Sequence, residues 1–159
     1  MTDILNAPLS ASPDTVRTAA PGFKLFGARS IVWATFLGSP LAGGYLLWSN
    51  SKRLGNASRA WNELTVTVVG TVVLLLLAFA LDDSNGASKA LGHVTALLGI
   101  FAVAFYTGKI QAPDIRAHIF AGGKLESGWK AFGIGLLGLV VMFAAIAIFA
   151  ALTTNPESL

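Results

Sequence analysis

Four long apolar stretches that lack Asp, Glu, Lys and Arg alternate with short polar segments along this chain. Each stretch is close to the roughly 20 residues that an α-helix needs to cross the ~30 Å hydrocarbon core of a bilayer. The pattern therefore predicts an all-α integral membrane helical bundle of three to four transmembrane helices. The bundle occupies 30–152, with predicted spans at 31–48, 64–81, 91–107 and 131–152, and a polar tail follows at 153–159.

The first stretch contains residues that disrupt a continuous helix. Pro40 lacks a backbone N–H, and its ring clashes with the carbonyl four residues earlier, so a straight helix is disfavoured there. Two interpretations remain open: a kinked span that crosses the membrane, or a re-entrant segment that returns to the side from which it came. The candidate helix-break or packing site comprises Gly38, Ser39, Pro40, Gly43, Gly44 and Asn50.

The polar segments carry signals of their own. Residues 1–29 are expected to form a disordered tail and then an interfacial segment that leads into the membrane. Leu54 and Gly55 form a helix stop signal, after which Asn56 is a candidate N-cap. In the long connection before the last stretch, we predict a short amphipathic helix at about 113–121 that lies in the membrane interface.

The distribution of Lys and Arg bears on the two interpretations of the first stretch. If that stretch crosses the membrane, seven of the eleven basic residues lie on one side and four on the other. If it re-enters, ten lie on one side and only Lys89 on the other. The positive-inside rule favours the re-entrant arrangement, whereas a kinked span is the commoner structure. Both arrangements place the C-terminus outside.

The Trp residues support the predicted boundaries independently of hydropathy. Amphipathic rings concentrate where a membrane meets water. All four Trp lie within three residues of a predicted span boundary: Trp33, Trp48, Trp61 and Trp129.

Composition excludes several classes of protein. Only 12% of the residues are charged, about half of the ~25% of a soluble domain. The chain has no Cys, so it has no disulfides, thiolate metal site or Cys nucleophile. The basic residues that give the net charge of +3 lie between apolar stretches. Their expected partner is therefore the lipid bilayer, and no nucleic acid is expected.

His93 is the one ionisable side chain clearly inside a predicted span, which makes it a candidate intramembrane polar residue. It could shuttle protons, or it could form a weak divalent-metal site with Asp82 and Asp83 of the preceding turn. We favour the interpretation that His93 lies at the membrane boundary, with its imidazole bonded to headgroups or backbone. Asp82 and Asp83 are then simply two acids in a solvated turn. No metal site and no cofactor are therefore assigned.

The sequence offers no convergent set of acid, base and nucleophile. Ser39 lacks a GxSxG frame, so its expected role is to satisfy backbone groups freed by Pro40. Gly43 and Gly44 could admit a ligand, but close helix contact is the more usual role. We therefore predict no catalytic residue and a protein that is not an enzyme.

Basic residues in the two polar connections are candidate contacts for anionic lipid or for a protein partner. The competing interpretation, which we slightly favour, is that they only anchor the topology. The candidates are Lys52, Arg53, Arg116, His118 and Lys124.

The segment LFGARSIVWATFLGSPLAGGYLLWSNSKRLGN (Leu25–Asn56) resembles the N-terminal signature, FLGxPLAGG…N..RLG, of a family of small bacterial multi-pass inner-membrane proteins. The stretches at 118–123 and 127–129 are similar to the second signature of that family. The resemblance carries over no catalytic residue. It implies a protein of the bacterial inner (plasma) membrane in which the first stretch, Asn50 and the 118–129 connection act together.

These features bear on three classes of function. The leading one is a non-catalytic accessory or structural membrane protein that packs against itself, as a homo-oligomer, or against a larger membrane complex. The alternative is a small transporter or channel component that uses the broken 38–44 segment. An intramembrane enzyme is least favoured, because no reactive set of side chains converges.

Overall fold

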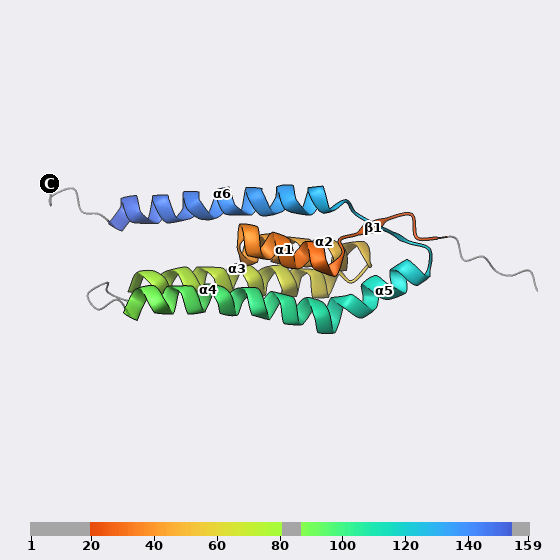
Figure 1. Cartoon of the computed structure of the whole chain (residues 1–159), viewed down its shortest axis with the longest axis horizontal. Helices are drawn as coiled ribbons and strands as arrows, with labels where there is room; N and C mark the ends of the chain where they lie inside the picture. The colour runs from red at the N-terminus through yellow and green to blue at the C-terminus, as the bar shows by residue number, and fades with distance from the viewer. Residues whose placement is uncertain (1–19, 81–86, 154–159) are drawn as a thin grey trace, which may run out of the picture.

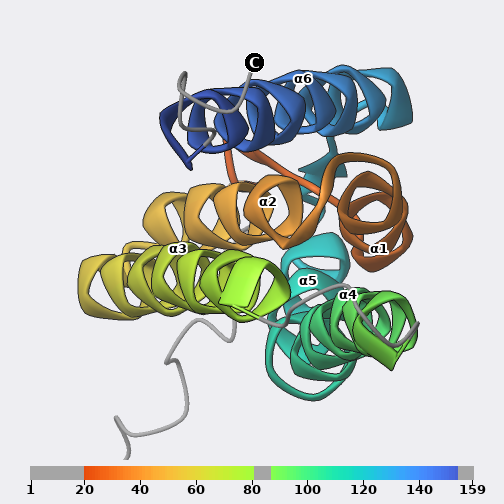
Figure 2. The ribbon, with the colours of Figure 1, turned by 90° about the vertical axis from the view of Figure 1, so that its left-hand side faces the viewer.

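The structure, a computed structural model, describes residues 20–80 and 87–153, and these are mostly helical. Three long helices, α3 (Ala57–Ala80), α4 (Ala87–Tyr106) and α6 (Gly128–Thr153), run along the length of the molecule (Figure 1). Two shorter helices, α1 (Ala28–Gly38) and α2 (Pro40–Arg53), lie side by side between α6 and the α3–α4 pair (Figure 2).

The first apolar stretch is a helical hairpin. The chain reverses at Ser39, whose φ of 84° and ψ of 166° are otherwise found almost only at Gly. Pro40 is the first residue of α2, where its missing N–H interrupts no helical hydrogen bond. Both helices reach only about half the length of α6 (Figure 1). The stretch 31–48 therefore does not form one continuous helix, and the chain reverses within it, as the re-entrant interpretation expects.

The connection from α2 to α3 follows the predicted signals. Gly55 adopts a φ of +78°, and the Asn56 N–H closes the helix end by donating to the Ser51 carbonyl at 2.9 Å. The Asn56 side chain then accepts from the Arg59 N–H at 3.1 Å, which confirms the N-cap. Because α3 begins at this cap, it starts seven residues before the apolar stretch at 64–81 and includes Arg59 and Glu63.

The chain stays helical beyond the end of the apolar stretch at 91–107. From α4 it passes through a π-helical turn, η2 (Thr107–Gln111), into α5 (Ala112–Phe120). Helix α5 bends toward the end of the molecule where the hairpin of α1 and α2 begins (Figure 1). The two isoleucines of α5 differ in burial: Ile115 is buried, whereas Ile119 is 45% exposed. One face of α5 thus packs on the protein.

A two-stranded parallel sheet ties the N-terminal segment to the α5–α6 connection. Strand β1 (Lys24–Leu25) pairs with β2 (Lys124–Leu125), with Lys24 opposite Lys124. The Glu126 N–H extends the pairing by donating to the Leu25 carbonyl at 2.8 Å. Leu25, the first residue of the N-terminal signature-like segment, is therefore paired with the residues that lie between the stretches 118–123 and 127–129.

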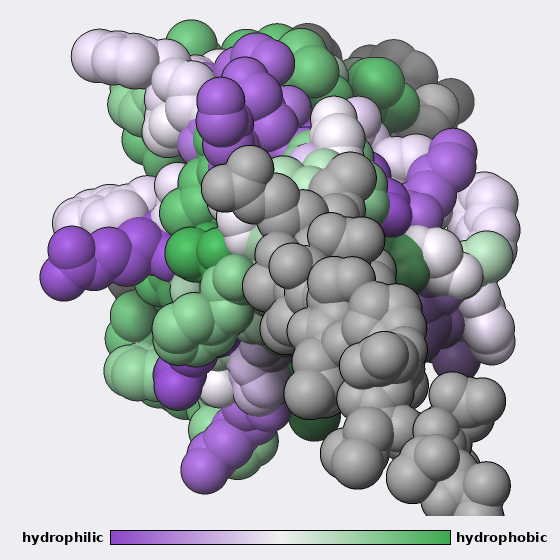
Figure 3. Space-filling model, turned by 90° about the vertical axis from the view of Figure 1, so that its right-hand side faces the viewer, coloured by the Kyte–Doolittle hydropathy of each residue, from purple (hydrophilic) through white to green (hydrophobic). Residues whose placement is uncertain are grey.

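The charges and Trp residues gather at one end of the molecule, which we call the basic end. Trp61 and Trp129 lie in the first two turns of α3 and α6, and Trp33 and Trp48 lie near the middle of α1 and α2. All four are on this side of the molecule because the hairpin returns the chain to its starting side. Hydrophilic side chains project around this end (Figure 3). Of the described Lys and Arg, all but Lys89 are here: Lys24, Arg29, Lys52, Arg53, Arg59, Lys109, Arg116, Lys124 and Lys130.

Much of the remaining surface is apolar. Side chains such as Val66 on α3, Phe101 on α4 and Phe143 on α6 are more than 60% exposed. The segments Ala57–Leu77 and Gly128–Ala151 are long and apolar enough to cross a membrane. The helical class of the prediction is therefore confirmed together with two candidate membrane helices. Of the predicted tails at 1–29 and 153–159, residues 1–19 and 154–159 lie outside the described residues.

Candidate functional site

Glycines hold the hairpin against its neighbours at van der Waals contact. A Cβ added to Gly38 would collide with the Gly135 carbonyl, and one added to Gly138 would lie 2.7 Å from the Gly38 oxygen. A Cβ on Gly43 would collide with Thr35 of α1, and one on Gly44 would collide with Thr67 of α3. The glycines at 43 and 44 therefore serve close helix contact, and neither opens a ligand site.

Asn50 fastens the two ends of the hairpin together. The Phe26 N–H donates to Asn50 Oδ1 at 2.8 Å, and Asn50 Nδ2 donates to the Phe26 carbonyl at 2.9 Å. The side chain is fully buried, so this reciprocal pair replaces the water that both backbone groups would otherwise bind. Asn50 Nδ2 also lies 3.2 Å from Gln111 Oε1, which links the hairpin to η2.

Gln111 is the hub of the polar residues buried at the basic end. Its Nε2 lies 2.9 Å from the Leu47 carbonyl, 3.1 Å from Ser51 Oγ and 3.0 Å from Glu63 Oε1. A single Gln beside an apolar stretch gives no sequence signal of such a role. The π-helical turn of η2 brings its side chain to the end of α2.

Charged side chains join this network. Glu63 Oε1 accepts from the Tyr106 hydroxyl at 2.8 Å and lies 3.3 Å from Arg59 Nε. The Arg59 guanidinium also donates to Asp114 of α5 at 2.7 Å. We call the whole set the polar cluster: Asn50, Ser51, Arg59, Glu63, Tyr106, Gln111 and Asp114.

Glu63 is a buried acidic residue that lies just before the predicted span at 64–81. Its side chain is only 3% exposed, because α3 begins at the Asn56 cap and carries Glu63 beneath the end of α4. Oxygen Oε1 has several donors, but Oε2 is buried without a hydrogen-bond partner in the described part of the chain.

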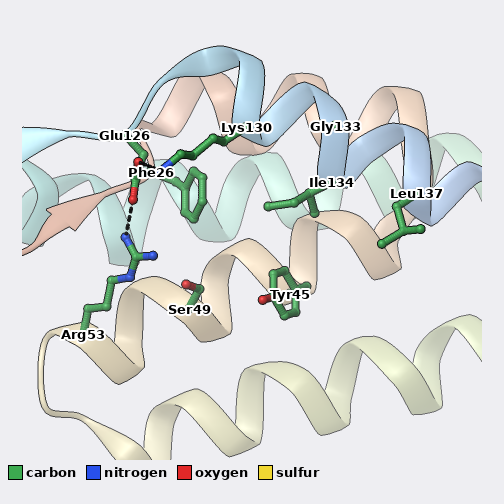
Figure 4. A pocket seen from close by; sticks show the side chains of 9 residues that line it. All are labelled: Phe26, Tyr45, Ser49, Arg53, Glu126, Lys130, Gly133, Ile134 and Leu137. Carbon is green, nitrogen blue, oxygen red and sulfur yellow. Dashed lines mark hydrogen bonds and ion pairs between the residues drawn. The ribbon is translucent and has the colours of Figure 1, made fainter.

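A cleft of about 420 Å³ lies between α2 and α6 at the basic end (Figure 4). Three charged residues that line it form a bridge: Glu126 pairs with Arg53 of α2 at 3.1 Å and with Lys130 of α6 at 2.9 Å. Ile134 and Leu137 point from α6 toward α2 and form its apolar wall (Figure 4). The bridge thus fastens the start of α6 to the end of the hairpin.

The bridge makes stability depend on pH. The hydrogen bond from Lys130 holds the pKa of Glu126 below its ordinary value of 4.5; burial opposes this effect and Arg53 adds to it. A depressed folded-state pKa stabilises the protein above pH 4.5, and this contribution is lost as pH falls through the folded pKa. We therefore expect the stability difference between the wild type and Glu126→Gln to shrink on acidification. Thermal unfolding in detergent from about pH 7 to pH 3 measures it. An unchanged difference would contradict the assignment.

His118 is a buried residue, and the expectation that it contacts lipid or a partner from the surface is wrong. It is 4% exposed, stacks on Phe23 with ring centroids 4.8 Å apart, and has Nε2 3.3 Å from the Lys124 carbonyl. The absence of a side chain at Gly123 lets the turn close over the imidazole ring. His118 therefore helps to fix the β2 segment.

The remaining candidate residues are not brought together. Lys52 lies over the Trp48 ring, with Nζ 4.9 Å from the ring centroid, whereas Arg116 and Lys124 are exposed at the basic end. His93 is on α4, 13 residues before Tyr106 or about 20 Å along the axis, and its side chain lies outside the described residues. Asp82 and Asp83 also lie outside them. The described residues contain no group of three or more His, Cys, Asp or Glu that could hold a metal.

Comparison with known proteins gave no match: no family model, no curated protein and no solved structure is similar to this chain. The resemblance to a bacterial inner-membrane family therefore stays a prediction.

Proposed function

We propose that this chain is a multi-pass protein of the bacterial inner membrane, with three spanning helices and one re-entrant hairpin. At 1.5 Å per residue, α3, α4 and α6 are each about 30–39 Å long, which suffices to cross a ~30 Å core. The 11 residues of α1 and the 14 of α2 reach only about 16–21 Å. The exposed apolar faces of the long helices support this placement, since large exposed apolar surfaces mark membrane or protein contacts.

The basic end faces the cytoplasm in this proposal. Nearly all described Lys and Arg lie there, as the positive-inside rule requires. The Trp residues at the same end would lie at the level of the lipid headgroups.

Cysteine labelling tests this topology in the naturally Cys-free chain. The exposed positions Gly22 and Ser58 flank the hairpin. We expect Gly22→Cys and Ser58→Cys to react with an impermeant maleimide in inside-out vesicles, and neither to react in intact spheroplasts. Labelling of the two positions from opposite sides would exclude the re-entrant hairpin.

Within that membrane, we propose a non-catalytic accessory role in which α6 packs against a second copy or a larger membrane complex. Ala131, Gly135 and Gly138 use one side of α6 to pack on the hairpin. The exposed small residues Ala144, Ala147 and Ala151 follow at helical spacing on the opposite side. Small residues allow close approach of membrane helices, and this exposed small-residue face is the observation that carries the proposal.

The transporter alternative gains no support from the hairpin. The space beside Gly43 is filled by Thr35, and the space beside Gly44 is filled by Thr67. The broken segment therefore offers no opening at these two positions.

Substitution on α6 tests the accessory role. We expect Ala147→Trp to dissociate the oligomer or complex extracted in mild detergent, because the larger ring prevents close helix approach. Val69→Trp is the matched control, since Val69 is 55% exposed on α3, away from α6. Mass and copurifying partners are measured by light scattering and mass spectrometry. A wild-type chain that is monomeric and free of partners would refute the accessory role.

A further inference from the structure

A second cavity, of about 510 Å³, lies between α3 and α4 and is unrelated to the Glu126 bridge. We call it the α3–α4 groove. Its walls are apolar side chains of the two helices, and its floor is made by Pro40 and Leu47 of the hairpin. Val66 and Leu98, which are 72% and 62% exposed, line its rim. The volume falls within the range of about 300–1,000 Å³ found for small-molecule sites.

One end of this groove is polar, because Glu63 and Tyr106 line it there. Glu63 Oε1 is contacted by Tyr106, Gln111 and Arg59, but Oε2 is buried and has no hydrogen-bond partner among the described residues. A buried carboxylate oxygen in this state costs free energy until a donor reaches it. The carboxylate that lines this end of the groove therefore has one unsatisfied oxygen.

The charges around Glu63 also do not balance. Arg59 is shared between two carboxylates, at 3.3 Å from Glu63 and 2.7 Å from Asp114. No other Lys or Arg forms an ion pair with these two carboxylates among the described residues. The three groups together carry one net negative charge, so a cationic donor complements the site better than a neutral or anionic one.

We propose that the α3–α4 groove binds one phospholipid with a primary-ammonium headgroup. The ammonium donates to the Glu63 carboxylate at the polar end of the groove, and an acyl chain lies between α3 and α4. Glu63 is two residues from Trp61, which is 62% exposed at the basic end, so the carboxylate lies at the depth where headgroups meet the hydrocarbon core. The inference rests on the proposed membrane placement, but it does not depend on the α6 contact.

Lipid retention in the whole protein tests the inference. The chain is reconstituted in vesicles of equal parts phosphatidylethanolamine, phosphatidylcholine and phosphatidylglycerol, re-extracted in mild detergent, and examined by native mass spectrometry. We expect the wild type to retain one phosphatidylethanolamine. Glu63→Gln should reduce the preference for it by about tenfold, since it removes a charge-assisted hydrogen bond.

A second variant keeps the test valid if Glu63→Gln folds poorly. A Cβ on Gly70 meets no atom of the described residues within 4 Å, and Gly70 lines the groove, so Gly70→Leu fills the groove without a backbone collision. It should lose all retained lipid. Gly133→Leu is its matched control, as Gly133 is equally open but lies on α6. Glu126→Gln is the control for loss of a carboxylate at the same end.

The possible outcomes separate this inference from the proposed function. Equal retention of the three lipids, retention of none, unchanged retention in both groove variants, or a copurified protein helix cross-linked to the groove would each overturn the lipid site. These results would leave the topology and the α6 association standing. Failure of the chain to insert into vesicles would overturn both proposals.

Discussion

Replacing Gly38 by Ala is expected to separate the hairpin from α6 and to destabilise the protein by about 3 kcal/mol, near the upper limit for overpacked sites. The added methyl group would collide with the Gly135 carbonyl. Because the obstacle is backbone, a change of side-chain rotamer cannot relieve the collision, and the two helices must move apart. Unfolding in mixed micelles with increasing dodecyl sulfate, followed by circular dichroism, measures the loss.

Two open glycines provide the control. A Cβ at Gly70 or Gly133 meets nothing within 4 Å. Ala at either position should therefore be neutral or should stabilise the helix, by up to ~1 kcal/mol. If Gly38→Ala behaved like these two variants, the close contact between α1 and α6 would be refuted.

Replacing Asn50 by Leu is expected to have an effect of similar size, about 3 kcal/mol or more, since it leaves several buried polar groups without partners. The Phe26 N–H and carbonyl would both lose their side-chain partner, as would Gln111 Oε1. The same micelle titration measures stability. Protease sensitivity at the exposed Lys24 reports whether the segment before α1 has been released.

Asn56 is the reference residue for this second experiment. It caps α3 through one exposed hydrogen bond to the Arg59 N–H, so Asn56→Ala should cost only about 1 kcal/mol and leave the Phe26 segment protected. Equal losses for the two substitutions would mean that Asn50 does not fasten the hairpin.

The helical class, the end of α2 and the start of α3 follow from local chemistry. Pro40 and Ser39 mark the break, and Gly55 with Asn56 marks the next turn, because each acts on backbone groups within a few residues. The Asn56 cap also shows why Glu63 was missed: hydropathy detects where an apolar stretch starts, whereas the cap marks where the helix starts. A helix that begins at this cap includes Glu63 in its second turn.

The candidate site could not be assembled in this way. Asn50 is a candidate in the helix-break site, but its role depends on Phe26, 24 residues away. Gln111 reaches Ser51 and Glu63 across 60 and 48 residues. Such contacts depend on how helices pack, and uncharged polar residues beside apolar stretches carry no spacing that reveals them.

The sequence by itself determined that this chain forms apolar helices, where the first of them breaks, and that its basic residues lie mostly in a few connections. Only the tertiary structure decided that the break is a reversal. A proline allows both a kink and a turn, and the choice depends on long-range contacts: Gly38 against Gly135, and Asn50 against Phe26. Those contacts bring the basic connections and all four Trp to one end, and they bury Glu63 beside the groove.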